Sequence, residues 1–330
     1  MISFIVIGRN EGCKLTNCLE SIFNVINLNN LTDSDIIYVD SKSTDDSIER
    51  ASKFKDVKIF SIDGDCNAAI ARNIGAKESL GNLLFFIDGD MEIEASFIKN
   101  VSGNIFGNEA ICIAGHLDDI FYDSIGVYLG QHPRTYRNSI PKEPIELLTN
   151  GGIFIIRKEL WEKVGSMRTK FKHSQDMDFT IRLSNHGIKT VRFPYFIAKH
   201  HTIDYRNEKR MWKMLLSGYD FYPALLFKYH ILNFNLVRRT FRSHYTAFSF
   251  LILVISLAFN ASLSITVGAI FASLILSKVI IHTNRAVTKR NKILYFCERL
   301  LLQVLRDISF LFAIFFFFPR EKKIEYSQIQ

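Results

Sequence analysis

The sequence predicts an α/β protein with a mixed, mainly parallel sheet, helices on both faces of the sheet, and membrane helices in the C-terminal part. Strand patterns at residues 3–7, 35–39 and 57–62 alternate with helix patterns, as in parallel sheets, where neighbouring strands need a crossover connection. Residues 83–87 are an unbroken apolar run, which indicates a strand covered on both faces. Residues 243–277 then contain no Asp, Glu, Lys or Arg, and this run is longer than the ~20 residues that span a bilayer.

Composition divides the chain into three expected regions. Residues 1–204 carry the alternating strands and helices and are expected to form an α/β domain. Residues 205–242 mix basic and aromatic side chains, which is typical of a helical region at a membrane interface. Residues 243–330 are expected to form the membrane region.

Two apolar segments are expected within the membrane region. The polar patch at residues 260–264 allows a helical hairpin over about residues 245–281, although one long tilted span also fits the pattern. A short apolar segment at about residues 304–318 is expected to be interfacial or re-entrant, unless it extends further back with Arg306 and Asp307 paired inside.

The net charge of +8 is unevenly distributed along the chain. Residues 1–198 hold 22 Lys and Arg against 26 Asp and Glu, a balance of −4, whereas residues 199–330 hold 19 against 7, a balance of +12. Because the basic part also carries the apolar runs, we expect its partners to be membrane lipids rather than nucleic acid. Met1 leads directly into a strand pattern without a basic signal region, so we expect a cell-membrane protein with its N-terminal domain, residues 1–204, on the cytoplasmic side.

Two aspartates, Asp88 and Asp90, directly follow the apolar strand at residues 83–87. Ligands of open α/β sheets bind beyond the carboxyl ends of the strands, where these side chains would project. Two carboxylates there repel each other unless a cation lies between them, and a divalent ion that holds phosphates is the usual solution. A plain turn is the alternative, because Asp-Gly-Asp is ordinary turn chemistry. The similar triplet at residues 63–65 follows a more polar strand, and we interpret it as a loop.

Three polar loops, at residues 8–12, 40–46 and 88–92, follow strands that are expected to end at one edge of the sheet. This convergence predicts a nucleotide pocket. The first strand is not followed by Gly-x-Gly-x-x-Gly, and a Walker-type lysine loop is missing. Dehydrogenases and P-loop enzymes are therefore disfavoured.

Five motifs follow one another along roughly residues 1–200. They are FIVIGRNEG at 4–12, IIYVDSKSTDDS at 36–47, AIARNIGAKESLGNLLFFIDGDMEI at 69–93, NGGIFIIRKELWEKVG at 150–165 and HSQDMDFTIRLSNHG at 173–187. Together they resemble the family 2 glycosyltransferases, which have the GT-A fold. The resemblance implies transfer of a sugar, usually with inversion, from a nucleotide-diphosphate sugar to an acceptor hydroxyl. It also implies a divalent cation, Mn²⁺ or Mg²⁺, that stabilises the leaving diphosphate.

The resemblance assigns roles in donor and metal binding. Asp90 is expected to bind the metal, and Asp88 to contact the metal or the donor ribose. Either His200 or His201 is expected to complete the metal coordination, since strand alternation directs only one of them inward. Further residues expected to bind the nucleotide sugar are Arg9, Glu11, Asp40 and Arg72. Asp40 departs from the family pattern because the second acid and the glycine that usually follow are absent, and a helix cap is its alternative role.

Asp176 occupies the place of the family's catalytic base, which an acceptor hydroxyl needs as it attacks. The glutamate that usually precedes this base is Gln175 here. Helix N-capping is the alternative role, because a helix pattern follows. The residues expected to bind the acceptor are Asn150, Gly151, Gly152 and Asp178, with a turn before a strand as the alternative for the glycines.

A membrane-anchored member of this family suggests a lipid-linked saccharide as the acceptor, in cell-surface glycan or polysaccharide synthesis. One alternative is transfer to polyprenyl phosphate, whose phosphate could be bound by Arg206, Lys209 and Arg210. The other alternative is a catalytically degenerate GT-A fold retained as a membrane scaffold.

Overall fold

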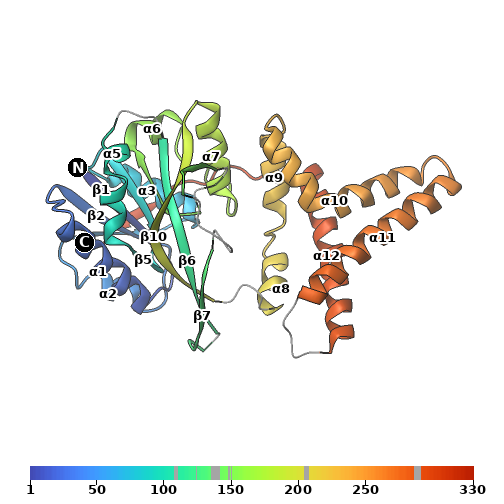
Figure 1. Cartoon of the computed structure of the whole chain (residues 1–330), viewed down its shortest axis with the longest axis horizontal. Coiled ribbons are helices and arrows are strands. Elements are labelled where there is room, and N and C mark those ends of the chain that lie inside the picture. Colours follow the sequence, from blue (N-terminus) through green and yellow to red (C-terminus); the bar gives the residue numbers. More distant parts are fainter. Residues whose placement is uncertain are drawn as a thin grey trace. The chain divides into compact units, whose positions relative to one another are not determined.

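The computed structural model describes residues 1–107, 111–123, 125–134, 142–147, 149, 151–203, 208–285 and 291–330. The chain divides into two compact units, whose residues can be followed along the colour bar in Figure 1. Met1–Asp204 together with Arg320–Gln330 forms the first unit, and Tyr205–Pro319 forms the second.

One sheet forms the centre of the first unit (Figure 1). Its strands within the described residues are β1 (Ile2–Gly8), β2 (Ser34–Asp40), β3 (Val57–Ile62), β4 (Leu83–Asp88), β5 (Met91–Ile93), β6 (Ile111–Tyr122), β7 (Tyr128–Pro133), β8 (Ile145–Glu146), β9 (Phe154–Arg157), β10 (Lys189–Ile203) and β11 (Tyr326–Gln328). The strand order is β11-β3-β2-β1-β4-β9-β6-β10-β5, with β7 paired to β6 and β8 paired to β10.

The half of the sheet around β1 is parallel and places three strand ends side by side. β1 pairs in parallel with both β2 and β4, and β2 pairs in parallel with β3. Gly8 lies level with Asp40, and Ile7 lies level with Asp88. The predicted mixed α/β sheet is therefore confirmed. It is less parallel than expected, because β5, β7, β8, β9 and β11 make antiparallel pairs.

Helices cover both faces of the sheet, as predicted. The helices of the first unit are α1 (Cys13–Leu28), α2 (Ser47–Ala51), α3 (Ala68–Glu78), α4 (Ala95–Asn100), α5 (Ser102–Ile105), α6 (Lys158–Lys163) and α7 (Gln175–Asn185). Phe4 and Val6 of β1 belong to the buried cluster on the α1 side, whereas Ile5 and Ile7 belong to the cluster on the α3 side. Successive strand residues face opposite sides, so a central strand with two covered faces is apolar throughout.

The end of the chain returns to the first unit. β11 pairs antiparallel with β3 at the edge of the sheet, and the Tyr326 ring packs against Phe60. Lys77 Nζ donates a hydrogen bond of 2.8 Å to the Tyr326 hydroxyl. The expectation that residues 243–330 form one membrane region is therefore corrected for Arg320–Gln330. A three-residue strand is too short to show a periodic pattern, and its partner strand lies far away in the sequence.

The second unit is helical over its described residues. Its helices are α8 (Glu208–Leu216), α9 (Phe221–Tyr229), α10 (Phe234–Ser256), α11 (Ala261–Arg285) and α12 (Lys292–Phe316). α10 and α11 form a hairpin in which the rings of Phe250 and Phe271 lie 5.4 Å apart. Ser256 and Ser264 are hydrogen-bonded across the turn. This turn lies within the range 245–281 where a hairpin was expected, and both helices extend beyond that range.

The short apolar segment expected at about residues 304–318 is the C-terminal half of α12, a helix of 25 residues. Arg306 and Asp307 are not paired with each other: Arg306 Nε donates to Asp220 Oδ1 at 2.9 Å. Consecutive helix residues do not face each other, which explains the difference. In the described part of the chain, one helical stretch, Ala261–Asn284, is long and apolar enough to cross a membrane, with a mean hydropathy of 2.1.

The close packing of α3 on β1 can be tested at Gly75. A Cβ at this position would overlap the side chain of Ile5, so we expect Gly75→Ala to lower the free energy of unfolding by about 1–3 kcal/mol. Gly103 in α5 is the control, since a Cβ there meets nothing within 4 Å, and Gly103→Ala should change stability by less than about 1 kcal/mol. Denaturant titration of both variants measures the difference, and equal losses would contradict the packing explanation.

Candidate active site

Asp88 and Asp90 lie at the carboxyl end of β4, where the sequence places them. Asp88 is the last residue of β4, and β5 begins immediately after Asp90. The turn between them is held close to the neighbouring strand, because Gly89 N donates a hydrogen bond of 2.8 Å to the carbonyl of Ile7. Both carboxylates are therefore positioned by backbone contacts to β1.

The Asp88 carboxylate is paired with a buried guanidinium group from α3. Arg72 Nη2 lies 2.6 Å from Asp88 Oδ1 and donates a second hydrogen bond, of 3.2 Å, to the carbonyl of Gly152. Burial raises the pKa of Asp88, the Arg72 charge lowers it and the Asp90 charge raises it, with a net rise. The Nε and Nη1 atoms of Arg72 are also buried and have no hydrogen-bond partner among the described residues. Arg72 therefore keeps two N–H donor groups, Nε and Nη1, that the pairing with Asp88 does not use.

Gly152 makes this pairing sterically possible. Its backbone has φ +88°, a conformation that favours glycine. A Cβ at Gly152 would lie 2.9 Å from Asp88 Oδ2 and 3.3 Å from Arg72 Nη2. Gly151 also has a positive φ, of 73°, but a Cβ there would meet only Leu117 Cδ1 at 3.9 Å. The structure thus places Gly152 against the Arg72–Asp88 pair, while acceptor binding by the two glycines stays a prediction.

His200 connects Asp90 to a second carboxylate. Its Nε2 lies 3.3 Å from Asp90 Oδ2, and its Nδ1 lies 2.7 Å from Asp119 Oδ1. Arg134 Nε in turn donates to both oxygens of Asp119, at 2.8 and 3.0 Å. Burial disfavours the charged imidazole, but the hydrogen bonds to Asp119 and Asp90 outweigh it and raise the pKa of His200.

His201 has different partners because successive residues of β10 face opposite sides of the sheet. Its Nε2 lies 2.8 Å from Glu92 Oε1, and its Nδ1 lies 2.9 Å from the Tyr122 hydroxyl. Of the two candidate histidines, His200 is therefore the one that contacts the aspartate pair.

The residues around Asp90 have the chemistry of a divalent-cation site. Within the described residues, no three His, Cys, Asp or Glu side chains already form a group that could hold a metal ion. The donors nevertheless fit one. Carboxylate oxygens are the ligands that Mg²⁺ and similar ions prefer, and the Asp119 contact orients His200 as carboxylates orient metal-binding histidines. Burial, followed by the charge of Asp90, raises the pKa of Glu11 to about 7, so a cation would also relieve repulsion among these acids.

Two other residues predicted to bind the nucleotide have partners outside this group of contacts. Arg9 is exposed, and its Nη1 lies 3.9 Å from Cys66 Sγ. Asp40 is fully buried, and its carboxylate accepts hydrogen bonds from the Tyr38 hydroxyl and from the backbone and hydroxyl of Ser43. Asp40 therefore holds the loop after β2 and caps no helix. Contact between Asp40 and a donor stays a prediction.

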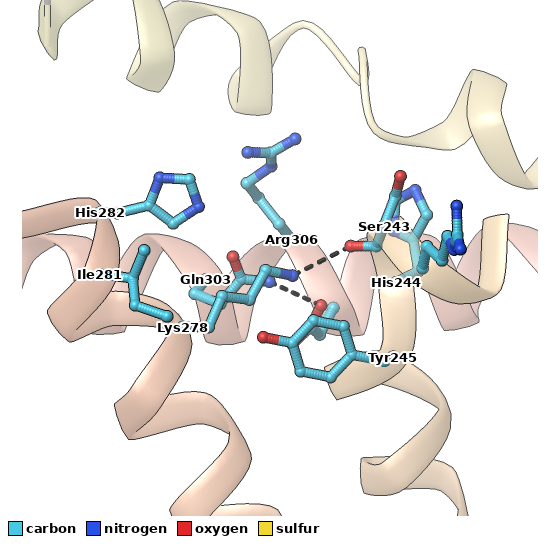
Figure 2. A pocket seen from close by; sticks show the side chains of 10 residues that line it. Ser243, His244, Tyr245, Lys278, Ile281, His282, Gln303 and Arg306 are labelled. Atoms are coloured by element: carbon cyan, nitrogen blue, oxygen red, sulfur yellow. Dashed lines mark hydrogen bonds between the residues drawn. The ribbon is translucent and has the colours of Figure 1, made fainter. Parts of the chain in front are cut away.

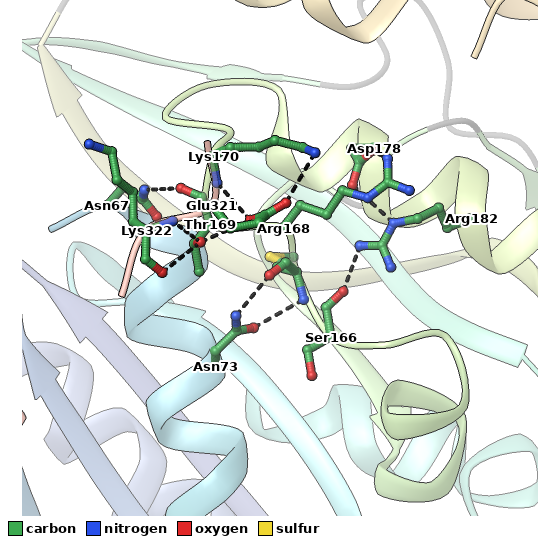
Figure 3. A network of polar contacts seen from close by, with 11 residues as sticks. Asn67, Asn73, Ser166, Arg168, Thr169, Lys170, Asp178, Arg182, Glu321 and Lys322 are labelled. Carbon is green, nitrogen blue, oxygen red and sulfur yellow. Dashed lines mark hydrogen bonds and ion pairs between the residues drawn. The ribbon is translucent and has the colours of Figure 1, made fainter. Parts of the chain in front are cut away.

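Asp176 and Asp178 both lie in the first turn of α7 but differ in their surroundings. Asp176 is half-buried, and its Oδ2 accepts a hydrogen bond of 2.7 Å from Thr149 Oγ1. Asp178 is fully buried and forms ion pairs of 3.0 Å with both Arg168 and Arg182 (Figure 3). We therefore replace the expected acceptor-binding role of Asp178 with a structural one, the anchoring of α7.

The loop before α7 is held by a polar network that the sequence did not reveal (Figure 3). Asn67, the N-cap residue of α3, and Asn73 within α3 donate hydrogen bonds of 2.8 Å to the carbonyls of Thr169 and Met167. Thr169 Oγ1 donates to Glu321 Oε2 at 2.9 Å. α3 and the C-terminal segment thus fix the loop that leads to Asp176.

Some predicted residues fall outside the described part of the chain. Asn150 and Arg206 are among the residues that the structure does not describe, and the side chains of Lys209 and Arg210 lie outside it as well. Their expected contacts with the acceptor stay predictions.

Comparison with known proteins identifies the domain that carries this site. The sequence profile described as glycosyl transferase family 2 matches residues 3–165. This part of the chain belongs to that family. An uncharacterized glycosyltransferase of Haemophilus influenzae is 26% identical over 193 residues, which cover 56% of this chain and 62% of the relative. The match thus spans less than two thirds of the relative's length.

Two solved glycosyltransferase structures share the fold. GalNAc-T7 with UDP, GalNAc and Mn²⁺ has a TM-score of 0.50 and 19% identity, over 63% of this chain and 44% of that one. Residues 1–349 of S. aureus TarS in complex with UDP have a TM-score of 0.50 and 18% identity, over 76% of this chain and 74% of that one. At these identities the likeness concerns the fold alone, and it confirms the expected GT-A fold of this family 2 domain.

The different surroundings of the two aspartates of α7 lead to a stability prediction. Asp178→Asn should lower the free energy of unfolding by about 3–5 kcal/mol, because it leaves the buried Arg182 without its counter-charge. Asp176→Asn should change it by less than about 1 kcal/mol, since the side chain is half-buried and keeps an oxygen for Thr149. Denaturant unfolding of both variants distinguishes the two roles. An equally large loss in Asp176→Asn would contradict the assignment.

Proposed function

We propose that this chain is an inverting glycosyltransferase that moves a sugar from a nucleotide-diphosphate sugar to an acceptor hydroxyl. The observation that carries the proposal is the paired arrangement beyond β4 in a family 2 domain, where Arg72 contacts Asp88 and His200 contacts Asp90. Such a site offers both a guanidinium and cation ligands to a diphosphate, which is the leaving group of this reaction.

Arg72 is the residue best placed to bind the donor diphosphate. Its Nε and Nη1 atoms are buried without a hydrogen-bond partner among the described residues. Leaving buried donors unsatisfied costs about 1–3 kcal/mol each, so an anionic ligand that accepts these bonds is strongly favoured. Since the structures of GalNAc-T7 and TarS both contain UDP, a uridine nucleotide is the first donor to test.

We assign a divalent cation, Mn²⁺ or Mg²⁺, to Asp88, Asp90 and His200. When bound, the ion would stabilise the negative charge that builds on the leaving diphosphate. Asp119 and Arg134 are positioning residues in this assignment, because they hold the imidazole through its Nδ1 side. The Mn²⁺ in the GalNAc-T7 structure supports the choice of ion.

Asp176 is proposed as the catalytic base. Thr149 orients the carboxylate through Oδ2, so Oδ1 can take the proton of the acceptor hydroxyl as that oxygen attacks the anomeric carbon. Attack on the face opposite the leaving diphosphate in a single displacement inverts the configuration at that carbon.

The acceptor is proposed to be a lipid-linked saccharide, used in cell-surface glycan or polysaccharide synthesis at the cytoplasmic side of the cell membrane. The stretch Ala261–Asn284 supports a membrane location by its length and its mean hydropathy of 2.1. The excess of basic residues in the C-terminal part, 19 against 7 acidic ones over residues 199–330, suits anionic lipid head groups.

The metal assignment predicts that His200 contributes to Mn²⁺ affinity and that its neighbour His201 does not. His200→Ala should lower the affinity for Mn²⁺ by at least about tenfold, because even residues that only support metal ligands contribute about 10–100-fold. His201→Ala is the matched control and should leave Mn²⁺ affinity within about twofold. Calorimetric titration of Mn²⁺ in the presence of UDP measures both values. A larger effect of His201→Ala would overturn the assignment.

The assignment of the base predicts loss of transfer without loss of donor binding. Asp176→Asn should lower kcat by about 10²–10⁴-fold, while UDP still raises the melting temperature in Mn²⁺. Transfer from a panel of uridine nucleotide sugars to lipid-linked saccharides is measured, with the anomeric configuration of the product determined by NMR. A retained configuration, or a wild-type chain that responds to no nucleotide, would contradict the proposed function.

A further inference from the structure

A cavity of about 420 Å³ lies in the second unit where α10, α11 and α12 come together (Figure 2). Three cationic side chains line it, one from each helix: Arg242, Lys278 and Arg306. The lining contains one carboxylate, that of Asp307. With neutral histidines the lining carries three positive charges and one negative charge, a balance of +2, so the cavity has the charge of an anion-binding site.

Lys278 of α11 is held by hydrogen bonds to residues at a break in α10. His244 has non-helical backbone angles of φ −116° and ψ 25°, and its ring stacks on Phe310. At this break Lys278 Nζ donates hydrogen bonds of 3.0 Å to the carbonyl of Ser243 and 3.2 Å to Thr246 Oγ1. An ammonium group has three N–H bonds, and these contacts use two of them. The lysine is thus held in place at the cavity wall.

Arg306 is held through one side of its guanidinium group. Nε donates to the buried Asp220 at 2.9 Å, which leaves the two Nη atoms as a fork. In Figure 2 the Arg306 guanidinium and the His282 ring project to the same side, beyond Gln303 and Lys278. A planar fork beside an ammonium group suits the oxygens of a phosphate better than a single-point anion.

Asp307 is a structural part of the cavity. It is 2% exposed, and Gln303 Nε2 donates a hydrogen bond of 2.8 Å to its Oδ1. Its charge opposes that of the neighbouring cations, and Asp220 offsets that of Arg306, so two carboxylates face three cations and a net charge of +1 remains. A partly buried excess of positive charge is costly unless a counter-ion binds, and a phosphate would supply it.

With the membrane location proposed above, the position of the cavity along the hairpin corresponds to a defined depth in the bilayer. Lys278 is the first charged residue after the charge-free run 243–277. From Ala261, where α11 begins, to Lys278 the helix rises about 26 Å at 1.5 Å per residue, close to the ~30 Å of the hydrocarbon core. If the turn of the hairpin lies at one surface of that core, the cavity lies at the level of the head groups on the other.

We propose that this cavity binds the phosphate group of an anionic membrane lipid, with Arg242, Lys278 and Arg306 as the contacting side chains. The lipid's acyl or prenyl chains would remain in the bilayer beside the apolar helices. The site is distinct from the donor site, since every residue that lines it belongs to Tyr205–Pro319.

The test is to count bound lipid on the full chain by native mass spectrometry. Detergent-solubilised protein is titrated with three ligands. Phosphatidic acid is the anionic lipid, phosphatidylcholine is the lipid without net charge, and inorganic phosphate is the phosphate without a lipid chain. We expect phosphatidic acid to bind with a stoichiometry of one and at least about tenfold more tightly than phosphatidylcholine. Inorganic phosphate should displace it only at far higher concentration.

Two variants locate the binding. Arg242→Gln removes an exposed cation, and Arg306→Lys keeps the charge near Asp220 but removes the fork; each should weaken phosphatidic acid binding by about tenfold, the size of one charge-assisted hydrogen-bond contact. Lys292→Gln is the control, because Lys292 is exposed and does not line the cavity. Equal affinities in all variants, no preference over phosphatidylcholine, or equally tight binding of inorganic phosphate would each overturn the proposal. Its failure is separable from failure of the proposed function, which shows instead as absence of UDP binding in Mn²⁺.

Discussion

Repulsion between carboxylates at the end of β4 is the constraint on which the candidate active site depends. The charge of Asp90 raises the pKa of both Glu11 and Asp88, and the charge of Asp88 raises that of Glu11 as well. Two cationic or hydrogen-bonding side chains offset this repulsion: Arg72 contacts Asp88, and His200 contacts Asp90. The buried arginine requires a glycine beside it, and the histidine requires its own support from Asp119. Much of the conformation around the strand ends follows from placing these acids together.

The sequence predicted the parts of this arrangement that leave local patterns. The apolar strands, the aspartates after β4 and the loops at one sheet edge could all be identified from single segments. It could not choose between His200 and His201, because the choice depends on which side of the sheet each histidine faces, and that follows from the register of β10 against β5. The sequence did not predict Asp119 or Arg134 as site residues. Asp119 lies in β6 and Arg134 directly after β7, and only strand pairing brings them to the site. Asp178 looked like a ligand because burial beside two arginines has no signature in the sequence.

The helical unit shows the same division between local and long-range information. A run without charges predicted the hairpin correctly as a local feature. The partners of the few charged residues around it come from other helices, as with Arg306 and Asp220 or Lys278 and Ser243. Burying a polar or charged group is costly unless it has a hydrogen-bond partner. The charged residues are therefore where most of the specific chemistry of this unit is found.

The return of the chain to β3 makes the helical unit an insertion within the first unit rather than an appendage at its end. The polypeptide leaves that unit after residue 204 and re-enters it at residue 320. A fragment that stops at the first boundary would lack β11 and expose the edge of β3, together with the Thr169 contacts that Glu321 makes. A minimal catalytic domain would need both segments, for example by joining them through a short linker in place of the helices.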